Sequence, residues 1–293
     1  MRRIRKLYLQ NAAGERFGLN GETNVYVTSI SGMGFTLSPS FADLERGFFI
    51  PVGTESEPQG TPAFTVVFTR NAYRSYTAFV NWLCSARSIT LVYDPTGDKE
   101  YFRDLEINSM QKGELNAVGW LEVPCSFYAL TPWYQPSPTV LDLGSAGEDD
   151  SKRYTYVYDE NLRYGIDSSA ALSGVISGGG HVPGALDLAY RGAITNPKIR
   201  LIGNASGKTY GICAVTAALN STDTLKYSSR YENSFVKKVA ADGTETDLLD
   251  ALDLSSGPFF HIPVDEPCTI SIEADQSFAG SADLLLYYYY RSV

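Results

Sequence analysis

The sequence predicts a mainly β protein, in which a β-sandwich-like first domain carries one packed helix and the second domain is a jelly-roll β-sandwich. Short apolar segments separated by turn residues recur along the 293 residues, among which are 26 Gly and 14 Pro. The chain is also rich in strand-favouring aromatics, with 20 Tyr and 14 Phe. Only one segment has helical periodicity. These features favour sandwiches or barrels over helical bundles.

The first domain is predicted to open with a β-hairpin. Alternating apolar residues at 7–9 and 17–19 flank the turn-rich stretch 11–15. Asp-Pro-Thr-Gly-Asp at 94–98 predicts another turn, because Pro fixes φ and Gly permits a positive φ. Further strand-like segments lie at 25–30, 47–52, 63–69, 89–93, 101–107 and 114–127.

A single amphipathic helix is predicted over residues 72–85. Tyr76, Phe79, Val80 and Leu83 follow an i, i+3, i+4, i+7 pattern, which places them on one face. Asn71 precedes the segment at a position suited to an N-cap. We therefore expect this helix to pack on a sheet of the first domain.

The domain boundary is predicted near Pro136. Residues 131–138 contain three prolines and no periodicity, which is typical of a linker. We therefore assign residues 1–135 to the first domain and 136–293 to the second. The second half has no strong helical period, and its strand-like segments lie at 199–202, 225–229, 270–274 and 282–290.

Composition and motifs indicate a protein that is not an enzyme. The formal net charge of −9 disfavours specific nucleic-acid binding. Two histidines and four widely spaced cysteines give no zinc-type ligand pairs, and no hydrolase or phosphate-binding motif occurs. We predict no catalytic residues, no metal and no cofactor. Without a signal-peptide core or a membrane-length apolar run, we expect a soluble protein made in the cytoplasm.

The tyrosine run 287–290 near the end of the chain supports two interpretations. A strand could bury one of its faces in a core, which leaves its tyrosines with a packing role. Alternatively, Tyr287 and Tyr289 could contact a partner or a glycan, because tyrosine rings pack on sugars and fill protein interfaces. Pairs of acidic residues such as Asp265 and Glu266 are expected to be solvated surface groups.

The order of these segments resembles the distal tail protein (Dit) family of long-tailed bacteriophages. In the first domain the hairpin, the helix and the stretch FYALTPWY at 127–134 carry the resemblance, together with 91–94 and 101–102. In the second domain the matching segments are 223–228, 236–239, 242–243, 252–254 and 259–263. The resemblance spans nearly the whole chain and depends on the order of the motifs.

The resemblance implies a structural role at the tail tip of the virion. First domains of such proteins form a hexameric ring that joins the tail tube to the hub or tail-associated lysin, near the tape-measure protein. DNA crosses the lumen without specific binding, and nothing inserts into a membrane. The second domain is galectin-like and docks a receptor-binding protein or touches cell-wall carbohydrate. Assembly is expected in the cytoplasm of the host bacterium.

The ring contact is predicted in the segment 47–52 and the polar stretch 53–61. Ring closure needs two different surfaces that meet on neighbouring copies, and unpaired strand edges suit this purpose. Our candidates for the contact are Phe48, Phe49, Ile50, Glu55 and Glu57. Two alternatives stay open, a stand-alone carbohydrate-binding module and a glycoside hydrolase fragment. A stand-alone carbohydrate-binding module does not explain the N-terminal domain. A glycoside hydrolase needs an acidic cleft that the sequence does not locate.

Overall fold

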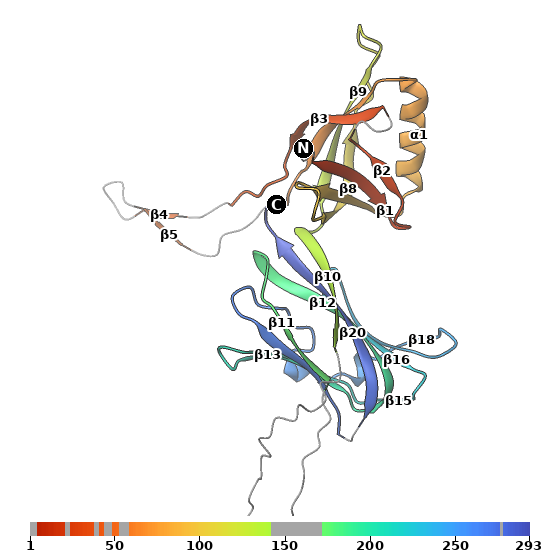
Figure 1. Cartoon of the computed structure of the whole chain (residues 1–293). Coiled ribbons are helices and arrows are strands. Elements are labelled where there is room, and N and C mark those ends of the chain that lie inside the picture. The colour runs from red at the N-terminus through yellow and green to blue at the C-terminus, as the bar shows by residue number, and fades with distance from the viewer. Residues whose placement is uncertain are drawn as a thin grey trace, which may run out of the picture. The chain divides into compact units, whose positions relative to one another are not determined.

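The computed structural model describes residues 5–20, 24–37, 41–43, 49–52, 59–141, 172–275 and 278–293. The chain divides into two compact units, Met1–Gln135 with Tyr290–Val293, and Pro136–Tyr289 (Figure 1). The expectation that residues 290–293 belong to the second domain is wrong. Tyr290 packs edge-on against Tyr101 of the first unit, with ring centroids 5.4 Å apart. No helix in the described ranges is long and apolar enough to cross a membrane.

The first unit is built on one antiparallel sheet in the strand order β2-β1-β7-β8-β9-β6-β3. Its strands are β1 (Lys6–Asn11), β2 (Arg16–Gly18), β3 (Val25–Ser31), β6 (Ala63–Phe68), β7 (Ile89–Asp94), β8 (Tyr101–Met110) and β9 (Leu121–Ala129). β8 pairs with β7 along its first half and with β9 along its second half, where the register shifts between Ile107 and Ser109.

The predicted N-terminal hairpin is present. β1 and β2 pair with Leu9 opposite Phe17. The turn is held by the Asn11 Oδ1 atom, which accepts hydrogen bonds from the backbone N–H groups of Ala13 (3.0 Å) and Glu15 (2.9 Å). An asparagine that closes a turn in this way explains why alternation stops at residue 11.

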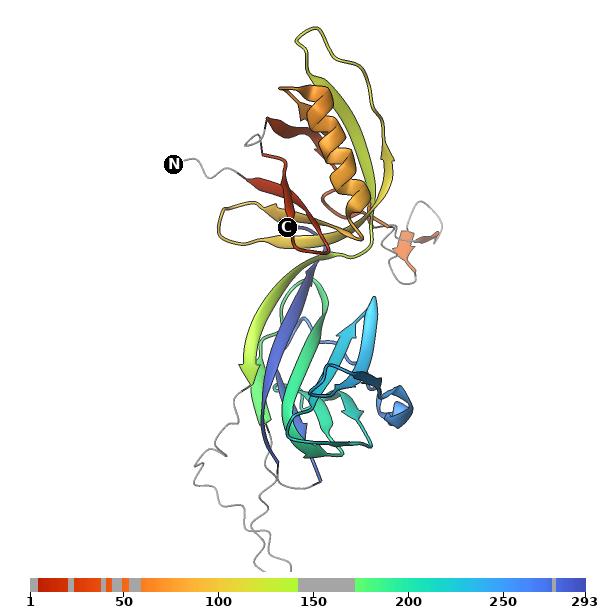
Figure 2. The same cartoon turned by 90° about the vertical axis from the view of Figure 1, so that its right-hand side faces the viewer.

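The helix α1 (Ala72–Ser85) has the bounds that its periodicity predicts, and it lies along the sheet of the first unit (Figure 2). Phe79 and Leu83 are buried, and the Phe79 ring lies 4.9 Å from that of Phe17. The expected cap is wrong in its mechanism. Asn71 occupies the N-cap position with a left-handed φ of 47°, and its side chain makes no capping hydrogen bond. Asparagine is used here because it tolerates a positive φ.

The second unit is a sandwich of two antiparallel sheets. One sheet has the order β18-β17-β16-β12-β20-β10 and the other β11-β19-β13-β14. The first contains β10 (Trp133–Leu141), β12 (Val182–Thr195), β16 (Thr224–Arg230), β17 (Asn233–Val239), β18 (Glu245–Asp247) and β20 (Ala279–Tyr290). The second contains β11 (Leu172–Ile176), β13 (Lys198–Gly203), β14 (Thr209–Ala214) and β19 (Cys268–Glu273), and the short β15 (Ala218–Leu219) pairs with β12.

Both sheets of the second unit contribute side chains to one hydrophobic core. Leu186 and Leu188 of β12 face Ile199 and Leu201 of β13 within this core, and Tyr227 is fully buried with them. Alternating burial along β13 is the pattern expected for one face of a sandwich. Only the 3₁₀ turns Leu249–Ala251 and Leu254–Ser256 interrupt the strands as helical segments in the described part of this unit. The mainly β prediction is confirmed.

Candidate functional site

The candidate ring contact lies in an excursion from the first unit, residues 32–61, which we call the arm. Within it β4 (Phe41–Asp43) pairs with β5 (Phe49–Pro51), and neither pairs with another strand of the described chain. Four apolar side chains among the described residues of the arm are well exposed, Phe35 (48%), Phe41 (57%), Ile50 (44%) and Val52 (40%). Apolar side chains exposed together on a protruding segment indicate a surface that a partner covers.

The structure places only part of the predicted contact set. Phe49 and Ile50 lie in β5, where they pair with Asp43 and Ala42. Phe48, Glu55 and Glu57 lie outside the described residues. The ring contact therefore stays a prediction for all five candidates, and Ile50 is the one whose exposure can be stated.

A buried arginine holds the beginning of the arm. Arg103 of β8 is 6% exposed, and its guanidinium lies over the Trp133 ring at 5.6 Å from the centroid. The Arg103 Nε donates to the Thr131 carbonyl at 3.1 Å, and Nη1 lies 3.5 Å from the Gly32 carbonyl. The Trp133 Nε1 donates to the Met33 carbonyl at 2.9 Å. Two planar side chains thus bind the backbone where the arm departs.

The end of the arm is fixed beside the same arginine. The Ala129 N–H donates to the Gly60 carbonyl at 2.8 Å, and the Gln59 amide donates to the Ala129 carbonyl at 3.1 Å. A Cβ atom at Gly60 would lie 2.5 Å from the Arg103 Nη2, so a larger residue at this position would displace the guanidinium. A hollow of about 240 Å³ lies between the two arm ends, with Arg103 and Phe35 in its lining. The arm is therefore anchored at both of its ends.

Sequence reasoning missed Arg103, although a signal for it exists. In β8, Arg103 and Leu105 are two residues apart and both are buried. A period of two puts both side chains on the same face of the strand. An arginine at an inward-facing position of a predicted strand therefore marks a buried cation, and the FYALTPWY stretch supplies its aromatic partner.

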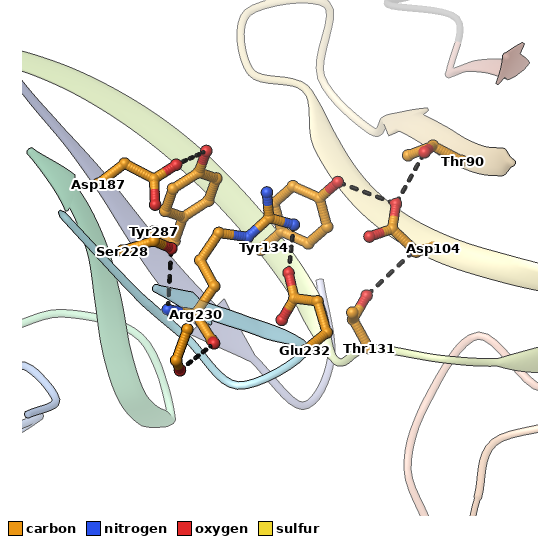
Figure 3. Close-up of polar contacts among 10 residues, drawn as sticks. Thr90, Asp104, Thr131, Tyr134, Asp187, Ser228, Arg230, Glu232 and Tyr287 are labelled. Atoms are coloured by element: carbon orange, nitrogen blue, oxygen red, sulfur yellow. Dashed lines mark hydrogen bonds and ion pairs between the residues drawn. The ribbon is translucent and has the colours of Figure 1, made fainter. Parts of the chain in front are cut away.

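A second polar cluster joins β7, β8 and the start of β10 (Figure 3). The Asp104 carboxylate accepts hydrogen bonds from the Thr90 hydroxyl at 2.7 Å and the Tyr134 hydroxyl at 3.0 Å. The Asp104 backbone N–H donates to the Thr131 hydroxyl at 3.0 Å. These bonds fix the residues around Trp133, which supports the anchoring of the arm.

Tyr287 and Tyr289 do not form an exposed contact surface, so the glycan or partner role considered for them is wrong. Tyr287 is 7% exposed and Tyr289 is 2% exposed. Figure 3 shows the Tyr287 hydroxyl pointing at Asp187, to which it donates at 2.9 Å. The Arg230 guanidinium lies 4.7 Å from the Tyr287 ring centroid and pairs with Glu232. Burial and the Asp187 carboxylate raise the pKa of Tyr287 above its usual value, and they outweigh the opposite effect of the Arg230 cation.

The acidic pair Asp265 and Glu266 divides into one solvated and one structural group. Asp265 is exposed, whereas Glu266 is 8% exposed. The Glu266 carboxylate accepts from the backbone N–H groups of Ala205 (3.1 Å) and Ser206 (3.0 Å), and from the Tyr210 hydroxyl. These hydrogen bonds lower the pKa of Glu266 to about 2. The described residues contain no group of three metal-ligating side chains.

Comparisons with known proteins agree with this architecture. The sequence profile of the distal tail protein N-terminal domain matches residues 6–130. A chain of the phage P2 baseplate in its activated conformation is 15% identical, with a TM-score of 0.66 over 99% of this chain and 100% of that chain. The Dit protein of phage SPP1 is 10% identical, with a TM-score of 0.58 over 96% and 98% of the two chains. A search of curated proteins found no match.

The sequence profile and the solved structures support different parts of this relationship. At 15% and 10% identity the solved structures show a shared fold over both units. The profile match is a sequence relationship, and it covers the hairpin, the arm, Arg103 and the helix. The resemblance that the order of motifs indicated is thereby confirmed. Residues 6–130 are thus similar to the N-terminal domain of distal tail proteins, and the chain shares its fold with a phage baseplate chain and with the SPP1 Dit protein.

Proposed function

We propose that six copies of this protein form a closed ring through their first domains. The ring would join the tail tube on one side to the hub or tail-associated lysin on the other. It would assemble in the host cytoplasm around the end of the tape-measure protein. Second domains would carry contacts with a receptor-binding protein or with the host surface. The role requires no reaction, in agreement with a family of structural proteins.

The anchored arm is the observation that carries the ring proposal. A heterologous ring needs a protruding element on one protomer and a complementary surface on the next. Ile50 and Val52 supply exposed apolar area on such an element. Arg103 and Trp133 hold its root, so less conformational freedom is lost when it binds a neighbour.

Charge supports the proposed passage of DNA through the ring. Each chain carries a net charge of −9, so six copies carry 6 × −9 = −54. A negative lumen would repel the phosphate backbone and keep DNA from adhering during ejection. Mapping of the lumen charge in an assembled tail tip tests this idea, and a strongly basic lumen would contradict it.

Substitution of the arm tests the ring contact. We expect Ile50→Asp to abolish incorporation of the protein into tails, because it places a charge in an apolar contact. Incorporation is measured by immunoblotting of purified particles from cells that express the variant in place of the wild-type protein. Val118→Asp changes an even more exposed apolar residue (71%) outside the arm and serves as the control.

Normal incorporation of the Ile50→Asp protein would argue against the arm as the ring contact. Loss of incorporation in both variants would point to a general sensitivity of the first domain. A matched circular dichroism melt of the two variants separates misfolding from failed assembly.

A further inference from the structure

The second unit contains a hollow of about 490 Å³ whose lining is largely aromatic. On its wall the rings of Tyr231 and His261 stack, with centroids 3.9 Å apart and planes 25° apart. Tyr210 and Phe259 contribute further ring surface. Small-molecule sites typically have volumes of roughly 300–1,000 Å³ and combine apolar walls with a few polar groups. The hollow has the size for one or two sugar rings.

Residues 258–262, which contribute Phe259 and His261 to this wall, are held in place by hydrogen bonds. The Tyr227 hydroxyl donates to the Pro258 carbonyl at 3.0 Å and accepts from the Phe260 N–H at 3.3 Å. Ile262 and Gly184 exchange two backbone hydrogen bonds of 2.8 Å. These bonds connect the segment to β16 and β12, so the hollow exists before any ligand arrives.

Glu266 holds Tyr210, one of the residues that line the hollow. Its carboxylate accepts from the Tyr210 hydroxyl and from the Ser206 hydroxyl, the latter at 2.7 Å. The Tyr210 ring, which lines the hollow, is thereby tied to the segment that carries Asp265. A buried carboxylate with this many donors holds the residues that it binds in place.

Three polar groups at the hollow are available for a ligand. Asp265 is exposed, and its carboxylate has no hydrogen-bond partner among the residues described. Tyr231 is 57% exposed, which leaves one face of its ring open. The His261 Nδ1 is buried and unpaired within the described structure. The site thus offers an open aromatic plane and a solvent-exposed carboxylate acceptor in the lining of one hollow.

We propose that this hollow binds an uncharged saccharide unit, with the sugar ring packed on Tyr231 and its hydroxyl groups donating to Asp265. Sugar rings present C–H groups on a face and hydroxyls at the edge, which matches an aromatic plane beside an acceptor. A protein surface that covered Asp265 would need its own cation to offset the desolvation of the carboxylate. The same charge disfavours anionic sugars. The proposal goes beyond the ring function and does not depend on it.

Saturation-transfer NMR with the full-length protein tests the proposal. The probes are the methyl glycosides of glucose, galactose, N-acetylglucosamine and rhamnose, with methyl glucuronide as the anionic comparison. At least one neutral glycoside is expected to bind, and more tightly than the glucuronide. Tyr231→Ala should weaken that binding by about 3- to 10-fold or more, since a ring contact is lost. Asp265→Asn should weaken it as well, whereas Tyr231→Phe should retain it.

Tyr128→Ala removes a tyrosine that is 39% exposed in the first unit, so it should leave binding unchanged. Thermal melts of each variant check that folding is intact. The proposal is overturned if none of the neutral glycosides binds, or if Tyr231→Ala binds as tightly as the wild type. It is also overturned if methyl glucuronide binds as tightly as the neutral sugars. Tyr231-dependent capture of another tail protein without sugar binding would identify the hollow as a protein-docking surface.

Discussion

Arg103 shows how one buried cation can organise a whole segment. Its guanidinium lies over Trp133 and donates to the Thr131 carbonyl, while the Gly32 carbonyl at the start of the arm lies 3.5 Å from Nη1. A fork of fixed N–H groups can bind several carbonyls at once, which a lysine ammonium does less well. The residue therefore couples the stability of the first unit to the position of the arm.

Replacement of Arg103 should destabilise the protein strongly. Arg103→Met leaves buried carbonyls without donors, so we expect the free energy of unfolding to fall by about 2–4 kcal/mol. Urea denaturation followed by tryptophan fluorescence provides the measurement. Arg191→Met removes an arginine whose ion pair with Asp283 is exposed, and it should cost at most about 1 kcal/mol. Equal effects of the two substitutions would contradict an anchoring role for Arg103.

Glu266 makes a pH-dependent contribution to stability. Hydrogen bonds from Tyr210 and Ser206 lower its pKa from 4.5 to about 2. The contribution is therefore fully present above pH 4.5 and is lost as the pH falls toward 2. Glu266→Gln should lower the thermal midpoint at pH 6, and the difference from the wild type should shrink between pH 4.5 and 2. A difference that stays constant over this range would rule out the assigned hydrogen bonds.

At the scale of single elements, periodic patterns predicted more than local capping rules did. The helix follows from the spacing of Phe79 and Leu83, because burial of one face decides where a helix can form. The β1–β2 hairpin follows from alternation around a turn-rich stretch. The role of Asn71 could not be predicted from the sequence, because asparagine is favoured both as a side-chain cap and in the left-handed conformation.

The conformation of Asn71 gives a test at this scale. Asn71→Gly should change the free energy of unfolding by no more than about 0.5 kcal/mol, because glycine adopts a positive φ without strain. Asn71→Val should cost about 1–2 kcal/mol, since a β-branched residue is disfavoured there. Thermal or urea unfolding of both variants measures the two changes. A large loss in the glycine variant would show that the side chain acts as a cap after all.

At the scale of the whole molecule, the sequence predicted two β-rich parts with a boundary near residue 136. It did not predict that residues 290–293 return to the first unit. The proline-rich stretch lies at the passage near Gln135, but the expectation of a linker there is wrong, because strand β10 continues through Pro136 and Pro138. The return of residues 290–293 to the first unit depends on contacts such as Tyr290 with Tyr101, which are distant in sequence. No local pattern reports such a contact.

The candidate sites were predicted less well for the same reason. Tyr287 and Tyr289 lie on the face of β20 opposite to Leu284 and Leu286, and both are buried there, so neither is open to a ligand. Arg230 covers the Tyr287 ring, and Tyr231 packs edge-on against Tyr289. The exposed aromatic surface comes instead from Tyr231 and His261, which lie 30 residues apart (261 − 231) and meet only in the folded sandwich. Composition could indicate that tyrosines serve as contacts, but only the strand register decides which ones are exposed.

Electron cryomicroscopy of assembled tail particles that contain this chain tests the central claim most directly. The account predicts six copies in a closed ring formed by residues 1–135. Phe41, Ile50 and Val52 of each arm should be covered by the neighbouring protomer. A reconstruction in which the first domains do not touch one another, or in which the arms stay exposed to solvent, would contradict it.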